Sequence, residues 1–347
     1  MNMLKPNHPF ALRLPVVAAP MFLVSGPELV TAACRAGIIG AFPTPNARPI
    51  ETLDDWMRQI TENLARAREE QPGVTIGPWC ANLVTHSSNT RLHEDLALVA
   101  KYKPPIVVTA LGSPKPAIEV VHEYGGIVVA DIINLKLAGK AIEAGVDGLA
   151  CICAGAGGHT GSLNPFSFVS AVREDFDGLV IVGGGISDGW GVAGALASGA
   201  DLVYMGTRFI PTLESMAAQE YKQMLIDSTS DDLLVSAALT GAPASWLKPS
   251  LRSRGLDPDN LPVTKPERNY DSNIAPTAKR WRDVWGAGQG VGAVKAVESV
   301  QTVVKRLDDE YRQALQRMAA ITVPGSGTAA NPGALDKSPR KLQEVHS

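Results

Sequence analysis

The sequence lacks the features that mark several large classes of protein. Its 32 basic and 35 acidic residues nearly cancel, and no block of Lys or Arg is present that would bind nucleic acid or an anionic membrane. No apolar run approaches the roughly 20 residues of a transmembrane helix. The four cysteines do not have the spacing of a metal site. We therefore expect no nucleic-acid, membrane or metal partner.

The cysteines are expected to be reduced and structural. Cys151 and Cys153 alternate along one apolar segment, so both would face the same side of a strand as small buried hydrophobic residues. Reduced thiols fit the cytoplasm, which is the expected location. With 45% hydrophobic and 19% charged residues in 347 positions, the composition is ordinary for a globular chain with a large core.

Eight short apolar runs have the length of β-strands. They cover residues 15–19, 38–42, 76–83, 105–110, 126–131, 147–153, 179–183 and 201–206. Each is apolar throughout, as expected of parallel strands that are buried on both faces. Segments with helical periodicity separate them, and Ser25 and Asp188 are the predicted N-caps of two of these helices.

Strand-then-helix units repeated eight times predict an α/β fold, a (β/α)8 TIM barrel, within residues 1–215. A doubly wound open sheet is the alternative, because the number of strands does not prove closure. Residues 216–321 are predicted to form a smaller, mostly helical segment over the barrel mouth, as a substrate-binding part or lid. Residues 322–347 are rich in Gly, Pro, Ala and charge and are predicted to be disordered.

Two glycine-rich turns follow the last two predicted strands, at residues 183–185 and 206–207. Barrels of this kind often bind phosphate at these two loops, beside a helix N-terminus whose dipole favours an anion. The helix predicted to begin at Asp188 would supply that N-terminus. We therefore predict a phosphate site here, and the alternative is that both are simply tight turns.

Residues 153–161 read CAGAGGHTG, which sets one histidine among glycines directly after the sixth strand. Glycine reaches positive φ at little steric cost and permits close approach of backbone. His159 would then be presented at the barrel mouth, where the active site of such a barrel lies. The alternative is a connecting loop whose histidine faces water.

Six stretches form a recognisable set. They are APM at 19–21, ANL at 81–83, the stretch at 153–161, VGGGISDG at 182–189, GADLVYMGTRF at 199–209 and WGAGQGVG at 285–292. The set resembles the nitronate monooxygenase family, formerly called 2-nitropropane dioxygenases, whose members are FMN-dependent barrels. The resemblance spans about residues 12–300. Flavin-dependent enoyl-acyl-carrier reductases and an NADH:quinone reductase branch share much of the pattern.

The resemblance implies a role for each matching position. The residues that would lie along the flavin ring are Pro20, Met21 and Phe22. Asn82 would hydrogen-bond the ring or the ribityl chain. The backbone of Ala156, Gly157 and Gly158 would pass close to the flavin. This would aim the catalytic residue, His159, at the substrate.

The resemblance also assigns the phosphate-binding residues, which are Gly183, Gly184, Gly185, Gly206 and Thr207. Asp131 is a departure, because related enzymes often have Lys or a small polar residue at this position. As a cofactor contact, Asp131 could not complement negative charge on a reduced flavin. Its alternative role is to cap the next helix.

The implied activity is the FMN-dependent oxidation by O2 of an alkyl nitronate, such as propionate 3-nitronate, or of a small nitroalkane, giving a carbonyl compound and nitrite. Histidine suits this chemistry because it can take a proton near neutral pH or hold an anion. The alternatives are an NAD(P)H-dependent reductase of quinones or enoyl thioesters, and a flavin-binding protein without turnover. Residues 246–255 either cover the mouth or form a subunit interface, which leaves a homodimer open.

Overall fold

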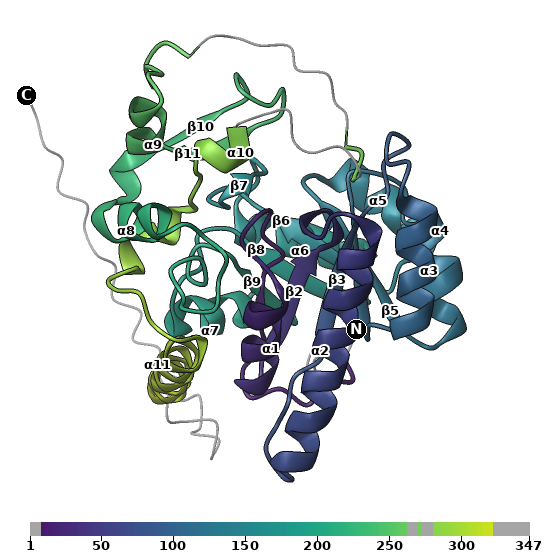
Figure 1. Ribbon diagram of the computed structural model, residues 1–347. Helices are drawn as coiled ribbons and strands as arrows, with labels where there is room; N and C mark the ends of the chain where they lie inside the picture. Colours follow the sequence, from purple (N-terminus) through teal and green to yellow (C-terminus); the bar gives the residue numbers. More distant parts are fainter. Residues whose placement is uncertain (1–7, 262–269, 273–279, 322–347) are drawn as a thin grey trace, which may run out of the picture.

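The computed structural model describes residues 8–261, 270–272 and 280–321. Eight parallel strands close into a barrel in the order β1-β2-β3-β4-β5-β6-β8-β9, with β9 paired to β1 (Figure 1). They are β1 (Val16–Ala18), β2 (Ile39–Pro43), β3 (Trp79–Val84), β4 (Ile106–Ala110), β5 (Ile127–Ile132), β6 (Gly148–Ile152), β8 (Leu179–Gly183) and β9 (Leu202–Met205). Closure excludes the open sheet and confirms the predicted TIM barrel.

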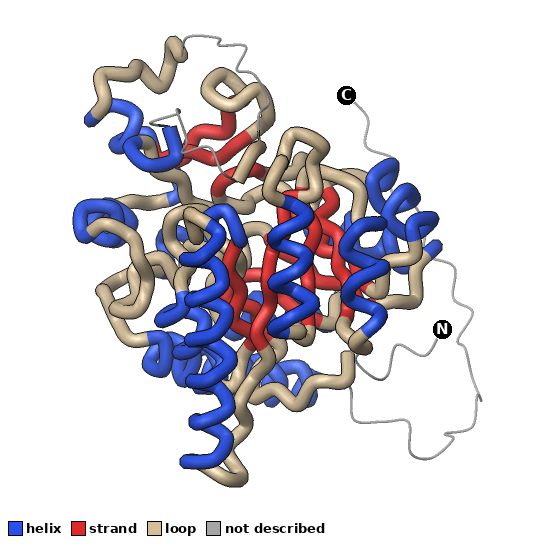
Figure 2. The backbone as a smooth tube through the Cα atoms, turned by 45° about the vertical axis from the view of Figure 1, so that its right-hand side comes forward, coloured by secondary structure: helices blue, strands red, loops and turns tan. Residues whose placement is uncertain are grey.

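Helices surround the barrel (Figure 2). They are α1 (Pro27–Arg35), α2 (Ile50–Glu70), α3 (Leu92–Tyr102), α4 (Lys115–Glu123), α5 (Leu135–Ala144), α6 (Pro165–Asp175), α7 (Gly189–Ala197) and α11 (Val300–Ile321). The last of these packs against α7 and α1, and its Val303, Val304 and Leu307 belong to the core between strands and helices. Helix α11 is therefore the eighth helix of the barrel, although it follows β9 only after a long insertion.

The insertion contains helices and a β-hairpin. Its elements are α8 (Gln219–Asp227), β10 (Leu233–Ser236), β11 (Ala244–Leu247), α9 (Lys248–Ser253), α10 (Arg280–Asp283) and the 3₁₀ turns η2 (Ser230–Asp232) and η3 (Gln289–Ala293); a further turn, η1 (Thr44–Asn46), follows β2. Strand β11 is the centre of a small antiparallel sheet, in which it pairs with β10 on one side and with the two-residue strand β7 (Gly158–His159) on the other. The segment predicted to be mostly helical thus also carries strands, and its last helix belongs to the barrel.

Two local predictions can be compared with the structure. Asp188 caps α7, because its Oδ1 accepts the Gly191 N–H at 2.7 Å. Ser25 does not cap α1: the N-cap position is Gly26, and Ser25 Oγ instead accepts the Met21 N–H. All four cysteines are buried and form no disulfide, as predicted.

Some predictions fall outside what the structure describes. The predicted disordered tail, 322–347, lies beyond the described residues.

Across the described ranges, no helix combines the length and apolar character needed to span a bilayer.

Candidate functional site

The carboxyl ends of the strands form a floor with little side-chain volume. One residue of each of β1, β3, β5 and β8 points into the barrel interior, namely Val17, Cys80, Val129 and Ile181. Because side chains alternate along a strand, the residue two positions later on each strand faces the interior as well. These four, which we call the floor, are Ala19, Asn82, Asp131 and Gly183. Alternate strands contribute such layers in this fold, so three predicted site residues share one layer.

Two members of the floor are polar. Asn82 is buried and donates from Nδ2 to Val108 O at 3.4 Å. Asp131 Oδ1 is buried without a hydrogen-bond partner among the described residues, although the residue as a whole keeps partial accessibility. Burial raises the pKa of the Asp131 carboxyl to about 7. Asn134 caps the following helix by accepting the Leu137 N–H, so the capping role considered for Asp131 is wrong.

The turn after β1 is fixed by side chains around it. Met21 O accepts the N–H groups of Val24 and Ser25, and it also accepts from Asn46 Nδ2 at 2.9 Å. Asn46 Oδ1 accepts the Leu23 N–H, which holds Leu23 at a φ of 61°. The Met21 side chain lies against Gly206, where an added Cβ would be 3.4 Å from the methionine sulfur. The predicted ring-side residues 20–22 therefore border one of the two predicted phosphate turns.

The turns after β8 and β9 keep much of their backbone in contact with the protein itself. Gly184 has a φ of +148°, and an added Cβ would lie 2.7 Å from Ala154 O. The Gly185 N–H donates to Gly155 O at 3.0 Å. Thr207 Oγ1 accepts the Gly288 N–H at 2.8 Å, which leaves the hydroxyl hydrogen of Thr207 available to donate.

The N-terminus of α7 is engaged by carboxylates. The Gly189 N–H donates to Glu310 at 2.8 Å, and the Gly191 N–H donates to Asp188. Negative charge therefore already occupies the end of the helix that we predicted to attract phosphate. An anion would therefore bind to the turns after β8 and β9 and not to the N-terminus of α7.

Residues 285–290 pass between the β6–β7 loop and β11, and their alternate glycines make this passage possible. An added Cβ would lie 2.5 Å from Ser245 O at Gly286, 2.7 Å from Gly155 O at Gly288 and 2.5 Å from the Ser187 side chain at Gly290. The Gln289 N–H also donates to Gly155 O at 2.9 Å. Gly286 and Gly288 are thus required by close packing of backbone on backbone, and Gly290 by the Ser187 side chain.

The glycines around His159 have a similar cause. A Cβ on Gly157 would lie 2.8 Å from the Gly288 nitrogen, so Gly157 packs on the segment 285–290. Gly158 has a φ of +65° and pairs with Ser245 in the small sheet. His159 itself is exposed and pairs with Ala244 of β11, and the next residue, Thr160, is tied to Pro243 O. His159 is therefore carried on a strand above the barrel and not on a free loop (Figure 1).

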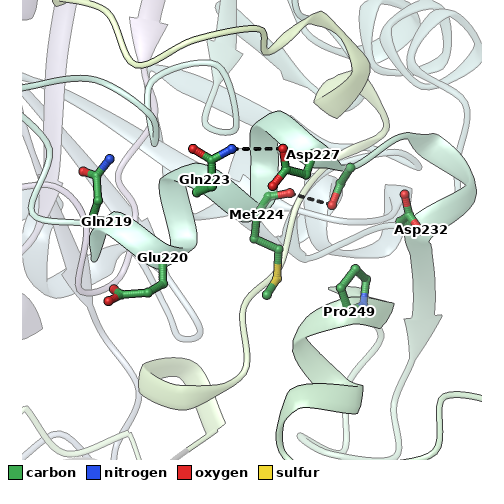
Figure 3. Close-up of a pocket in the computed structure, with 8 residues that line it drawn as sticks. Gln219, Glu220, Gln223, Met224, Asp227, Asp232 and Pro249 are labelled. Atoms are coloured by element: carbon green, nitrogen blue, oxygen red, sulfur yellow. Dashed lines mark hydrogen bonds between the residues drawn. The ribbon is translucent and has the colours of Figure 1, made fainter.

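Two cavities lie near the insertion. One, of about 400 Å³, is lined by Gly155, Ser230, Leu233, Val235, Ser245 and Gln289, and so opens beside the β6–β7 loop. The other, of about 560 Å³, is lined mainly by α8 side chains, among them Glu220 and Asp227 (Figure 3). Neither cavity is lined by a predicted site residue, and the carboxylates of the second would repel an anionic ligand.

Sequence reasoning missed several residues that shape the site. Gln289 and Ser245 line the cavity beside the β6–β7 loop, and Ser245 Oγ donates to Ala287 O at 2.7 Å. The alternate glycines at 286, 288 and 290 were a usable signal, since that spacing indicates close backbone approach along an extended segment. Asn46 gave no such signal, because its role depends on the folding of two separate loops against each other.

The architecture places this protein among the (β/α)8-barrel enzymes, whose active sites lie at the carboxyl ends of the strands. The sequence pattern that defines the nitronate monooxygenase family matches residues 7–310, and the chain belongs to that family. It is an oxidoreductase, and the family is one of flavoproteins.

Individual relatives agree with this assignment. The nitronate monooxygenase of Paraburkholderia phytofirmans is 28% identical over 346 residues, which cover 88% of this chain and 94% of the relative. The structure of nitroalkane oxidase from Streptomyces ansochromogenes has a TM-score of 0.72 at 23% identity, covering 88% of this chain and 98% of that one. The enoyl reductase domain of MlnA from Bacillus amyloliquefaciens has a TM-score of 0.63 at 14% identity, covering 89% and 96%. At these identities the two structures establish the fold alone.

The floor fits a flavin. Ala19 and Gly183 add little side-chain volume of their own at this level of the barrel, although an added Cβ at Gly183 would lie 2.9 Å from the Tyr204 Cβ. Asn82 supplies an amide, and Asp131 supplies a buried oxygen that lacks a partner among the described residues. Buried polar atoms are nearly always hydrogen-bonded in folded proteins, so this oxygen offers a hydrogen-bonding position that a ligand or a water molecule would fill.

Proposed function

We propose that this protein binds FMN on the floor and oxidises alkyl nitronates, or small nitroalkanes, with O2 to a carbonyl compound and nitrite. Propionate 3-nitronate is the substrate we favour testing first. The proposal is carried by one observation, the polar floor with its orphaned Asp131 oxygen in a barrel that belongs to the nitronate monooxygenase family. FMN, when bound, would accept electrons from the substrate and supply the reactivity toward O2.

The residues of the chain would bind, orient and move a proton. Gly183, Gly184, Gly185, Gly206 and Thr207 would hold the phosphate through the two turns, with the Thr207 hydroxyl as one donor. Pro20, Met21 and Phe22, together with Ala156, Gly157 and Gly158, would border the ring, and Asn82 would hydrogen-bond it. His159 would take the proton from the carbon of a neutral nitroalkane, or hold a nitronate by charge. Its strand pairing to Ala244 supports this role, because the pairing fixes where the imidazole is presented.

The test is anaerobic reduction of the purified protein. Flavin released by heat should have the mass of FMN, and a nitronate added without oxygen should bleach the visible flavin absorbance, whereas NADH should not. Readmitting O2 should restore the colour and yield nitrite. FAD in place of FMN would contradict the proposed cofactor, and bleaching by NADH alone would instead support a reductase of quinones or enoyl thioesters.

Three further proposals come from the sequence. They are a substrate-binding or lid role for the insertion that follows residue 215 and precedes α11, the cytoplasmic location and the homodimer. Size-exclusion chromatography with light scattering would test the last of these.

A further inference from the structure

Two buried polar atoms inside the barrel lack partners among the described residues. They are Asp131 Oδ1 and the Tyr204 hydroxyl. Asp131 belongs to the floor, and Tyr204 belongs to the interior core cluster. Native proteins leave few such atoms unsatisfied, and each one calls for a physical explanation. A flavin ring on the floor would lie next to Asp131 and directly above the core that contains Tyr204.

Among the residues that the structure describes, no positive charge compensates Asp131. In the sheet it pairs with Ala150 of β6, and the neighbouring β4 places Thr109 and Ala110 beside the end of β5. Burial, and no charged neighbour, is the cause of the raised pKa of its carboxyl. The titratable groups that face it across the interior are Tyr204 and Cys80, and burial raises the pKa of both. Neither ionises near neutral pH, so Asp131 is the group of this cluster that can change charge there.

A flavin on the floor would favour the neutral form of Asp131 for two reasons. The ring would displace the remaining water from the carboxyl, and loss of hydration disfavours a carboxylate. Reduction would also add negative charge to the ring, and an ionised carboxylate in the low-dielectric interior would repel it. A neutral carboxyl can instead donate a hydrogen bond to a ring oxygen or nitrogen. A protonated Asp131 therefore removes the conflict that an acidic residue at this position creates.

We propose that Asp131 holds a proton when the flavin is reduced and donates a hydrogen bond from it to the ring, so that Asp131 is a positioning and charge-controlling residue of the cofactor site. The proposal rests on the proposed binding of a flavin and extends it to one side chain of this chain.

The proposal fixes the direction of a pH effect. At acidic pH, Asp131 is neutral in both redox states of the flavin and takes up no proton when the flavin is reduced. At alkaline pH, Asp131 is ionised beside oxidised flavin and takes one proton from solvent as the ring gains electrons. The midpoint potential of the bound flavin should therefore fall more steeply with pH above the pKa of this carboxyl beside oxidised flavin than below it. That pKa is about 7 in the protein alone and is raised further when the ring displaces water.

The experiment measures the midpoint potential of the flavin-loaded protein against pH for the wild type, Asp131→Asn and Tyr204→Phe. The amide of Asp131→Asn mimics the neutral acid, so this variant should retain flavin and match the wild-type potential at acidic pH. It should have a more positive potential at alkaline pH and lack the change of slope. Tyr204→Phe removes the other orphaned polar atom without removing a charge that titrates near neutrality, so it should keep the change of slope.

Three outcomes would overturn the role of Asp131: parallel profiles for the wild type and Asp131→Asn, loss of flavin from Asp131→Asn, or loss of the change of slope in Tyr204→Phe as well. A flavin-loaded wild type with parallel profiles would contradict this role and leave the proposed function standing. Wild-type protein that retains no flavin would contradict the proposed function and with it the role of Asp131.

Discussion

At the scale of single residues, the position of His159 is fixed by its place on strand β7 and by the packing of the glycines beside it. The stretch CAGAGGHTG predicted a histidine presented at the mouth, and the histidine does lie on the short strand β7 above the barrel. The sequence could not show that Gly157 packs on Gly288, because the two are far apart in the chain. The residues of the floor were within reach of sequence reasoning, since Asn82, Asp131 and Gly183 all stand at the ends of predicted strands. The orphaned state of Asp131 was not, because it depends on which side chains fill the interior around it.

His159→Asn should leave flavin bound, since main-chain pairing to β11 holds β7 in place. Turnover of a neutral nitroalkane should fall by roughly 10²–10⁴-fold, the usual contribution of a general base. Oxidation of the corresponding nitronate should fall less, because that proton is already gone. Steady-state kcat/KM on both substrates measures the difference. His93→Asn, an exposed histidine of α3, is the matched control and should change neither value. Equal small losses on both substrates would mean that His159 is not a base.

At the scale of elements, the segment 285–290 joins the insertion to the barrel. At one end, Trp285 O accepts a hydrogen bond from the Leu247 N–H of β11. At the other end, the Gln289 N–H donates to Gly155 O in the β6–β7 loop. Tyr221 of α8 adds a hydrogen bond from its hydroxyl to Gly286 O. The small sheet that carries His159 is thus held to the barrel by contacts of backbone with backbone. Sequence reasoning predicted the strands of the barrel well, because each is a continuous apolar run within a repeated strand-then-helix pattern. It missed β10 and β11, which are short and lie in an insertion outside that pattern.

Gly157→Ala should weaken this junction. The new methyl group would meet the backbone of residues 287 and 288 at under 3 Å, and backbone cannot move aside as a flexible side chain can. We expect a loss of stability of about 1–3 kcal/mol, the usual cost of overpacking, together with loss of flavin. Gly139→Ala is the control, because Gly139 lies in α5 with nothing within 4 Å of an added Cβ. It should be neutral or slightly stabilising by helix propensity. Urea denaturation and the flavin absorbance of both purified variants measure the effects, and equal stability of the two would contradict the assigned packing.

At the scale of the whole molecule, the barrel is completed by a helix that follows its last strand only after the insertion. The repeated strand-then-helix pattern predicted closure of the barrel, and closure is what the pairing of β9 with β1 shows. The pattern did not predict where the eighth helix would come from. Helical periodicity over 300–321 marks an amphipathic helix but not its partner, and the partner here is the groove between α7 and α1. Arg13, before β1, also reaches α11 through an ion pair with the buried Asp308.

This placement predicts opposite results for two truncations of the chain. Removal of residues 322–347 should leave folding, flavin content and activity unchanged, because α11 ends at Ile321 and the removed part has few large apolar residues among its Gly, Pro, Ala and charged residues. Removal of residues 300–347 should abolish the folded protein. It would uncover the core around α7 and α1 and delete the buried Val303, Val304 and Leu307, each worth about 1.5–3 kcal/mol of burial. Their sum is comparable to the whole stability of an ordinary domain, about 5–15 kcal/mol. Soluble yield, thermal melting followed by circular dichroism and flavin absorbance would report both results. A stable, flavin-loaded protein without residues 300–321 would show that α11 is an appendage and not the eighth helix of the barrel.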